Sequence, residues 1–258
     1  MCKAVSRGSD ACRDEVNMAI TTEAIEYSDG STVLRGQLAR DHSQTDPRPG
    51  VLIAHTWAGC GPFERGKAAE IAKLGYVALA VDLYGGGIVG SSTEENAKLM
   101  SVLLEDRALL QRRMTAALNT LKALESVDAD RTAAIGYCFG GLCVLDLART
   151  GASLQAAVSF HGLLDPPDNI EAADVRARVL VLHGWDDPMA KPESVQALAD
   201  ELTMARADWQ VHAYGRTMHA FTNPAANNPE AGTVYDAQAD RRSWSSMRQL
   251  LRDSFELD

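Results

Sequence analysis

Long hydrophobic runs are missing from this sequence. The longest apolar stretches, at 51–54 and 76–81, have the length of strands, whereas a membrane-spanning helix needs about 20 apolar residues. Residues 1–17 are polar and mixed in charge, without the apolar core of a secretory signal. We therefore expect no membrane as a partner, and we expect residues 1–17 to be a disordered leader or a fusion remnant.

An excess of positive charge is also absent. The chain has 25 Lys and Arg against 35 Asp and Glu, a net charge of −10. This balance disfavours nucleic acid, whose phosphates attract basic patches. The expected partner is a small molecule, and a homodimer would be unsurprising.

The sequence lacks the spacings that hold zinc or build a disulfide framework. Its five cysteines form no C-x-x-C pair, and its six histidines form no H-x-x-x-H pair. We predict no metal, no other cofactor and a reducing, cytoplasmic setting. No repeat and no linker rich in Pro, Gly or Ser divides the chain, so residues 18–258 are expected to form one domain.

Strand-like and helix-like segments alternate along the chain. Runs at 23–27 and 32–39 flank a Ser-Asp-Gly-Ser turn and predict an antiparallel hairpin, and the apolar run at 50–55 is typical of a strand covered on both faces. Further strands are expected at 76–82, 132–136, 156–161, 178–183 and 209–214, and helices at 63–74, 94–126, 140–149, 193–204 and 236–255. This order predicts an α/β protein whose mostly parallel central sheet has helices on both faces.

The clearest chemical signal is Gly136-Tyr137-Cys138-Phe139-Gly140, a G-x-C-x-G pattern between a predicted strand and a predicted helix. It is typical of a nucleophile elbow that carries a thiol where serine is more usual. Glycines suit the strained turn on either side of the nucleophile, and the helix N-terminus favours a thiolate. The alternative is a buried structural cysteine in a glycine-rich turn.

A nucleophilic cysteine needs a base, and the base needs a carboxylate that orients it. In the α/β-hydrolase order both follow the nucleophile, and the histidine comes last. Asp187, held before Pro188 beyond the strand at 178–183, is preferred as the carboxylate, with Asp186 as its rival and a turn or helix cap as the alternative for both. His219, in the loop after the last strand, suits the base, although a loop histidine taken alone is more often structural.

The reaction also needs two hydrogen-bond donors at the developing oxyanion. The amide of Phe139, directly after the nucleophile, and the amide of Trp57, after the strand at 50–55, are predicted to supply them. Trp57 could also form a wall of an apolar pocket. The alternative for its loop is an ordinary turn at the end of a strand.

Weaker signals compete for a role at the site. Gly85–Gly90 matches G-x-G-x-x-G, which could indicate dinucleotide binding, but it precedes a separate helix cap and we interpret it as a mobile loop at the mouth of the site. His161, which ends a strand beside the elbow, could touch substrate, while a structural role is the first interpretation for it and for His55 and His183. Cys60 is a candidate pocket residue.

Four segments resemble the dienelactone hydrolase family of α/β-hydrolases: Asp82-Leu83-Tyr84-Gly85, Gly136–Gly141, Gly184–Pro188 and His219-Ala220-Phe221. The resemblance runs from about Glu23 to the C-terminus and implies an α/β-hydrolase fold without a large lid domain. It also implies a triad of Cys138, His219 and Asp187, because the family's acid lies three residues after the glycine.

Three positions depart from the family's pattern. Members that cleave dienelactone bind the substrate carboxylate with two arginines, and here Gly86 and Asn223 stand at those positions. Without these bidentate donors an anionic substrate is disfavoured. Thr56 replaces a glutamate that interacts with the resting thiol, which should favour a thiolate and imidazolium pair.

These observations predict a cofactor-free hydrolase that uses a covalent intermediate on small, neutral, activated esters or lactones. Substrate contacts are expected from Thr56, Cys60, Tyr84, Gly86, His161, Phe221 and Asn223. An alternative on the same triad is the hydrolysis of neutral aryl phosphotriesters. A hydrolase-like binding protein without turnover is an alternative of another class, and a nicotinamide oxidoreductase depends on the glycine motif alone.

Overall fold

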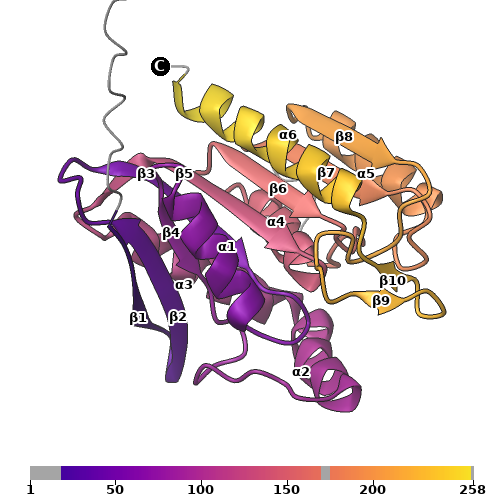
Figure 1. Cartoon of the computed structure of the whole chain (residues 1–258), viewed down its shortest axis with the longest axis horizontal. Helices are drawn as coiled ribbons and strands as arrows, with labels where there is room; N and C mark the ends of the chain where they lie inside the picture. Colours follow the sequence, from indigo (N-terminus) through magenta and orange to yellow (C-terminus); the bar gives the residue numbers. More distant parts are fainter. Residues whose placement is uncertain (1–18, 170–174, 257–258) are drawn as a thin grey trace, which may run out of the picture.

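The structure, a computed structural model, describes residues 19–169 and 175–256 and is built around one twisted eight-stranded sheet (Figure 1). Its strands are β1 (Ile20–Asp29), β2 (Thr32–Asp41), β3 (Arg48–Ala54), β4 (Val77–Ala80), β5 (Val127–Tyr137), β6 (Ala156–Phe160), β7 (Arg178–Gly184) and β8 (Trp209–Tyr214). They lie in the order β1-β2-β4-β3-β5-β6-β7-β8. The expectation for residues 1–17 lies outside the described residues.

The predicted mixture of strand directions is confirmed. β1 and β2 form the antiparallel hairpin, β2 pairs antiparallel with β4, and every pairing from β4 to β8 is parallel. All four residues of β4 and all five of β6 are buried, as expected for strands that are covered by helices on both faces.

Helices cover both faces of the sheet. They are α1 (Pro62–Ala72), α2 (Thr93–Glu105), α3 (Arg107–Lys122), α4 (Phe139–Arg149), α5 (Pro192–Met204) and α6 (Ala237–Glu256). The apolar sides of α3, α4 and α5 share one hydrophobic core, while α1 and α6 pack in a second core on the opposite face and lie in front of the sheet in Figure 1. No helix in the described part of the chain is long and apolar enough to span a membrane.

The single long helix predicted for 94–126 is wrong, because the chain breaks at Asp106. This residue leaves helical geometry, with φ −122° and ψ 80°, and its carboxylate accepts a hydrogen bond from the Leu109 amide at 2.8 Å. It therefore ends α2 and caps the start of α3. The apolar periodicity continues across the break, which is why the spacing of Leu103, Leu110 and Met114 concealed it.

The carboxyl ends of the parallel strands meet at one edge of the sheet. β3 leads to Trp57, β5 to Cys138 and β6 to His161, while Asp187 follows β7 and His219 lies in the connection from β8 to α6. That connection also contains a short pair of strands, β9 (Asn227–Asn228) and β10 (Thr233–Val234), and His219 forms a single bridge with Thr233. Segments far apart in sequence are thus brought to one site.

Candidate active site

Cys138 occupies a strained turn between β5 and α4. Its backbone has φ 57° and ψ −119°, a conformation that is rare for residues other than glycine. A Cβ at Gly136 would lie 2.0 Å from the Gly140 oxygen, and a Cβ at Gly140 would lie 2.2 Å from the Ala54 oxygen. The two glycines are therefore required by the close crossing of the backbone, and Cys138 as a residue is partly exposed at the start of α4.

His219 and Asp187 form a buried hydrogen-bonded pair. His219 Nδ1 lies 2.7 Å from Asp187 Oδ2, and the other carboxylate oxygen accepts the Met189 amide at 2.8 Å. Both carboxylate oxygens are thus occupied, and the ring has one orientation. Asp186, the rival in the sequence, is exposed, so Asp187 is the aspartate that contacts His219.

The second ring nitrogen of His219 faces Cys138. Nε2 is buried and has no hydrogen-bond partner among the described residues, which leaves it for the thiol of Cys138. Burial by itself raises the pKa of Cys138, but the charge of His219 and the amides of Phe139 and Trp57 outweigh burial, so that the pKa is lowered. Burial lowers the pKa of His219, but the charge of Cys138 and the bond to Asp187 raise it to about 10. The two groups therefore favour a thiolate and imidazolium pair.

The two predicted oxyanion donors both interact with the sulfur of Cys138. The amides of Phe139, at the start of α4, and Trp57, after β3, both stabilise the Cys138 thiolate. The Trp57 loop is held by Glu64 of α1, whose carboxylate accepts the Thr56 amide at 3.0 Å and the Gly61 amide at 2.9 Å. Glu64 is only 2 % exposed, so a buried carboxylate fixes the Trp57 loop through two hydrogen bonds.

His161 contacts both Cys138 and His219. The Cys138 amide donates to His161 Nδ1 at 3.1 Å, so His161 Nε2 carries the proton and donates to Thr222 Oγ1 at 2.8 Å. The rings of His161 and His219 meet edge to face at 5.1 Å. Burial, aided by the charge of His219, lowers the pKa of His161 well below its ordinary value, so His161 is a neutral neighbour of the charged pair.

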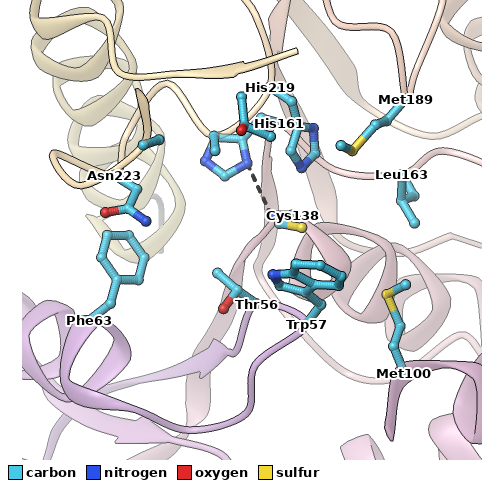
Figure 2. A pocket seen from close by; sticks show the side chains of 13 residues that line it. Thr56, Trp57, Phe63, Met100, Cys138, His161, Leu163, Met189, His219 and Asn223 are labelled. Atoms are coloured by element: carbon cyan, nitrogen blue, oxygen red, sulfur yellow. Dashed lines mark hydrogen bonds between the residues drawn. The ribbon is translucent and has the colours of Figure 1, made fainter. Parts of the chain in front are cut away.

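A cavity of about 390 Å³ opens at the thiol and is shown in Figure 2. Its lining residues are Thr56, Trp57, Phe63, Met100, Cys138, His161, Leu163, Met189, His219, Ala220, Asn223, Ala226 and Thr233. Met100, Leu163 and Met189 lie on one side of Cys138, and Phe63 and Asn223 lie on the other (Figure 2). No Asp, Glu, Lys or Arg of the described chain lines it.

Four residues expected at the substrate do not line this cavity. Cys60 is buried, its sulfur lies 3.6 Å from the Ala80 oxygen, and burial raises its pKa to about 12. Phe221 is fully buried behind His161, with ring centroids 5.0 Å apart. Tyr84 and Gly86 are also absent from the lining: the Tyr84 hydroxyl donates to the Trp57 oxygen, and the Gly86 amide donates to the Val33 oxygen. Thr56, His161 and Asn223 do line the cavity.

The glycine-rich segment after β4 is tied down by Asp82. One carboxylate oxygen accepts the amides of Tyr84 and Gly85, and the other accepts the amides of Arg35 and Gly87. A dinucleotide phosphate would need such amides for itself. The Asp82 carboxylate of the chain itself already occupies these amides.

Within the described residues, no group of three or more His, Cys, Asp or Glu side chains is arranged to hold a metal.

Comparison with known proteins identifies the family. The profile of the Dienelactone hydrolase family matches residues 34–255, most of the chain. The chain belongs to the dienelactone hydrolase family. Membership, together with the fold and the site, makes this family member a hydrolase that acts on ester bonds.

Three proteins show how similar this dienelactone hydrolase family member is to others in sequence and structure. It is 42 % identical to a protein solved under the name m3DLH, with a TM-score of 0.88 over 92 % of this chain and 99 % of the other. It is 38 % identical to a dienelactone hydrolase-like promiscuous phosphotriesterase from metagenomic libraries, with a TM-score of 0.87 over the same shares, 92 % and 99 %. A probable 2-oxo-3-(5-oxofuran-2-ylidene)propanoate lactonase of a Bradyrhizobium species is 27 % identical over 79 % of this chain and 86 % of its own.

Several residues of the site were missed by sequence reasoning. Glu64 was detectable, because Gly61-Pro62-Phe63-Glu64 is a helix start with an acidic residue in the capping-box position. Met100, Leu163 and Met189 carry no local signal. They stand on α2 and in the loops after β6 and β7, and only the packing of these elements brings them together.

Proposed function

We propose that this protein hydrolyses small, neutral, activated carboxylic esters or lactones by covalent catalysis with Cys138, His219 and Asp187. The observation that carries the proposal is an activated thiol at the base of a cavity without acidic or basic lining residues other than histidine. The order and contacts of the three side chains support the triad. A reducing, cytoplasmic setting, which would keep the free Cys138 thiol reduced, belongs to the same proposal.

In the first half of the reaction the Cys138 sulfur attacks the carbonyl carbon. The carbonyl oxygen becomes an oxyanion between the amides of Phe139 and Trp57. Collapse of this adduct breaks the bond between carbon and the leaving oxygen, and His219 gives that oxygen its proton. The products of this half are an alcohol or phenol and a thioester on Cys138.

In the second half water replaces the leaving group. Neutral His219 removes a proton from water, the hydroxide oxygen bonds to the acyl carbon, and the carbon–sulfur bond breaks. The thiolate and the imidazolium return, and a carboxylic acid is released. A lactone follows the same course, except that the alcohol and the acid leave as one molecule.

The nature of the nucleophile restricts the leaving group. A tetrahedral adduct expels thiolate more readily than alkoxide, so the adduct formed from an ester of a simple alcohol reverts to the ester and the free thiolate. Aryl and enol oxygens leave more easily, and activated esters and enol lactones are therefore the substrates that a thiol suits.

Neutral phosphotriesters are a second candidate class. The observation that favours them is the 38 % identity to a promiscuous phosphotriesterase, over nearly the full length of both chains. The Cys138 sulfur can attack phosphorus and expel the aryl oxide, while the amides of Phe139 and Trp57 donate hydrogen bonds to the phosphoryl oxygen as they would to an acyl oxygen. Water then attacks phosphorus, the phosphorus–sulfur bond breaks, and a phosphodiester is released.

A substrate panel with a nucleophile variant tests these proposals. Aryl esters, enol lactones and aryl phosphotriesters are assayed with the wild type and with Cys138→Ala. We expect turnover of at least one neutral class to fall by about a thousandfold or more in Cys138→Ala. Turnover that is equal in the two proteins would refute covalent catalysis by Cys138.

A thiol-reactive probe tests the non-catalytic alternative. The lowered pKa of Cys138 and the raised pKa of buried Cys60 predict that Cys138 reacts far faster near neutral pH. A protein in which Cys138 reacts no faster than Cys60 would have no activated nucleophile, and a binding role would then be favoured.

A further inference from the structure

Three consecutive peptide units of the loop after β3 are each held by a different side chain. Glu64 accepts the Thr56 amide at 3.0 Å, His55 Nδ1 lies 2.6 Å from the Thr56 oxygen, and the Tyr84 hydroxyl donates to the Trp57 oxygen at 2.8 Å. The middle unit joins Thr56 to Trp57 and contains the Trp57 amide. His55 is therefore the side chain that holds the peptide unit of the predicted oxyanion donor.

The contacts of His55 define its protonation state. The Leu83 amide donates to His55 Nε2 at 3.2 Å, so Nε2 is an acceptor and the ring proton resides on Nδ1. Nδ1 consequently donates to the Thr56 oxygen. The ring is fully buried, and burial lowers its pKa, so His55 stays neutral and keeps this single tautomer.

The hydrogen bond at the Thr56 oxygen acts on the Trp57 amide through the peptide plane. In a trans peptide the C=O and N–H bonds point in opposite directions, and no described peptide bond is cis. Fixing the oxygen therefore fixes the direction of the Trp57 N–H. Accepting a hydrogen bond also polarises the unit and makes its N–H a stronger donor.

The Trp57 N–H is directed at the reacting centre. It is one of the two amides that lower the pKa of Cys138. The His55 ring also lies beside the residue that supplies the other amide, with 6.1 Å between the ring centroids of His55 and Phe139. One buried imidazole thus binds the peptide unit of the Trp57 donor and lies near the side chain of the residue that supplies the other donor.

We propose that His55 is a positioning residue of the oxyanion hole, which aims and strengthens the Trp57 N–H through its hydrogen bond to the Thr56 oxygen. The inference rests on the proposed function of Cys138, because only an acyl or phosphoryl transfer develops charge at that amide. The strand-end position of His55 indicated a structural role, and the contacts add a functional one.

Two substitutions of His55 distinguish the contribution of Nδ1 from that of Nε2. In His55→Asn the side-chain amide stands close to the position of Nδ1 and can still donate to the Thr56 oxygen, while in His55→Gln it stands nearer to Nε2. We expect His55→Gln to lower kcat by about ten- to hundredfold with little change in KM, since removal of a whole oxyanion donor costs about a hundred- to thousandfold. His55→Asn should retain kcat to within about fivefold, because the donor is kept.

Alkylation of Cys138 by iodoacetamide distinguishes a positioning role of His55 from a purely structural one. Alkylation uses the thiolate but forms no oxyanion, so its rate per thiolate should be the same in the wild type and both variants, with the thiolate measured by its ultraviolet absorbance. Loss of acylation without loss of alkylation in His55→Gln supports the inference. Equal loss of both reactions, or equal kcat in His55→Gln and the wild type, overturns it.

Two controls keep the outcomes distinct. Thermal unfolding of both variants shows whether the buried substitution has damaged the fold. If His55→Gln does not fold, a loss of kcat in folded His55→Asn as large as the loss of about ten- to hundredfold expected for His55→Gln overturns the inference. Full turnover by Cys138→Ala would refute the proposed function itself. An inactive Cys138→Ala together with a fully active His55→Gln would refute only the role of His55.

Discussion

At the scale of single residues, the site depends on a few side chains that hold others. The charge of His219 lowers the pKa of Cys138, the His219 ring is hydrogen-bonded to Asp187, and the backbone amide of Cys138 donates to His161. That Cys138, Asp187 and His219 come together was predictable, because each stands at the sequence position that the proposed chemistry requires. The contacts of His161 were not, because they depend on the left-handed backbone at φ 39° that turns its ring toward the elbow.

The pKa values of Cys138 and His219 predict the pH dependence of activity. The active form has the thiolate and the imidazolium, so kcat/KM should rise as the pH passes the lowered pKa of Cys138, below the ordinary thiol value of about 8.5. It should fall as His219 loses its proton at about 10. Because Cys138 and His219 interact, the apparent pKa values of the rising and falling limbs of the profile belong to the pair and not to either residue alone. A kcat/KM profile that falls near the ordinary imidazole pKa, with no plateau, would contradict this assignment.

Asp187→Asn is the matched control for that profile. The hydrogen bond and charge of Asp187 both raise the pKa of His219. Removing the charge should therefore move the upper limb of the profile to lower pH and narrow the plateau. An upper limb that stays in place would show that Asp187 does not set the charge of His219.

Asn223 is the residue that tests the preference for neutral substrates. Its side-chain oxygen accepts the Ala225 amide at 3.0 Å, and its amide nitrogen points toward the cavity in Figure 2. Asn223→Arg should raise kcat/KM for esters that carry a carboxylate, relative to matched neutral esters, by about tenfold or more, since charge-assisted hydrogen bonds contribute about 1.5–3 kcal/mol. Asn223→Leu is the control, and an unchanged ratio in Asn223→Arg would contradict the electrostatic argument.

At the scale of elements, α4, the helix that begins directly after Cys138, is fixed by buried ion pairs. Arg107 of α3 binds both carboxylate oxygens of Asp146 on α4, at 2.7 and 2.6 Å. Arg149, also on α4, binds Asp146 and, at 2.7 and 2.8 Å, the two oxygens of Glu201 on α5. These bonds join α3, α4 and α5 in one layer beneath the elbow. The sequence showed the helices but not this network, because ion pairing between helices depends on how they pack.

Asp146→Ala tests the network. Asp146 is completely buried, and its loss leaves the guanidinium groups of Arg107 and Arg149 short of a partner. We expect the free energy of unfolding to fall by about 3–5 kcal/mol, the usual cost of breaking a buried pair, as measured by urea denaturation. Glu201→Ala should cost less, because the Glu201 side chain is 33 % exposed. Equal stability of Asp146→Ala and the wild type would contradict the expected contribution.

At the scale of the whole molecule, the order of helices and strands could be predicted from the sequence, whereas the shape of the cavity could not. Buried strands such as β3 and amphipathic helices such as α3 leave periodic patterns, so the alternation, the parallel sheet and the N-terminal hairpin followed from sequence. The break at Asp106 escaped because the apolar pattern continues through it. Cys60 was expected in the pocket, but the turn before α1 buries its sulfur against β4.

The central claim is that Cys138 forms a covalent acyl intermediate with a neutral substrate. The most direct measurement is the intact mass of the protein, quenched with acid during turnover of an activated aryl ester. We predict a mass increase of one acyl group, located on Cys138 by peptide mapping and absent from Cys138→Ala, together with a burst of about one phenol per active site. Turnover of the ester with no added mass, no burst and equal rates in Cys138→Ala would contradict the account.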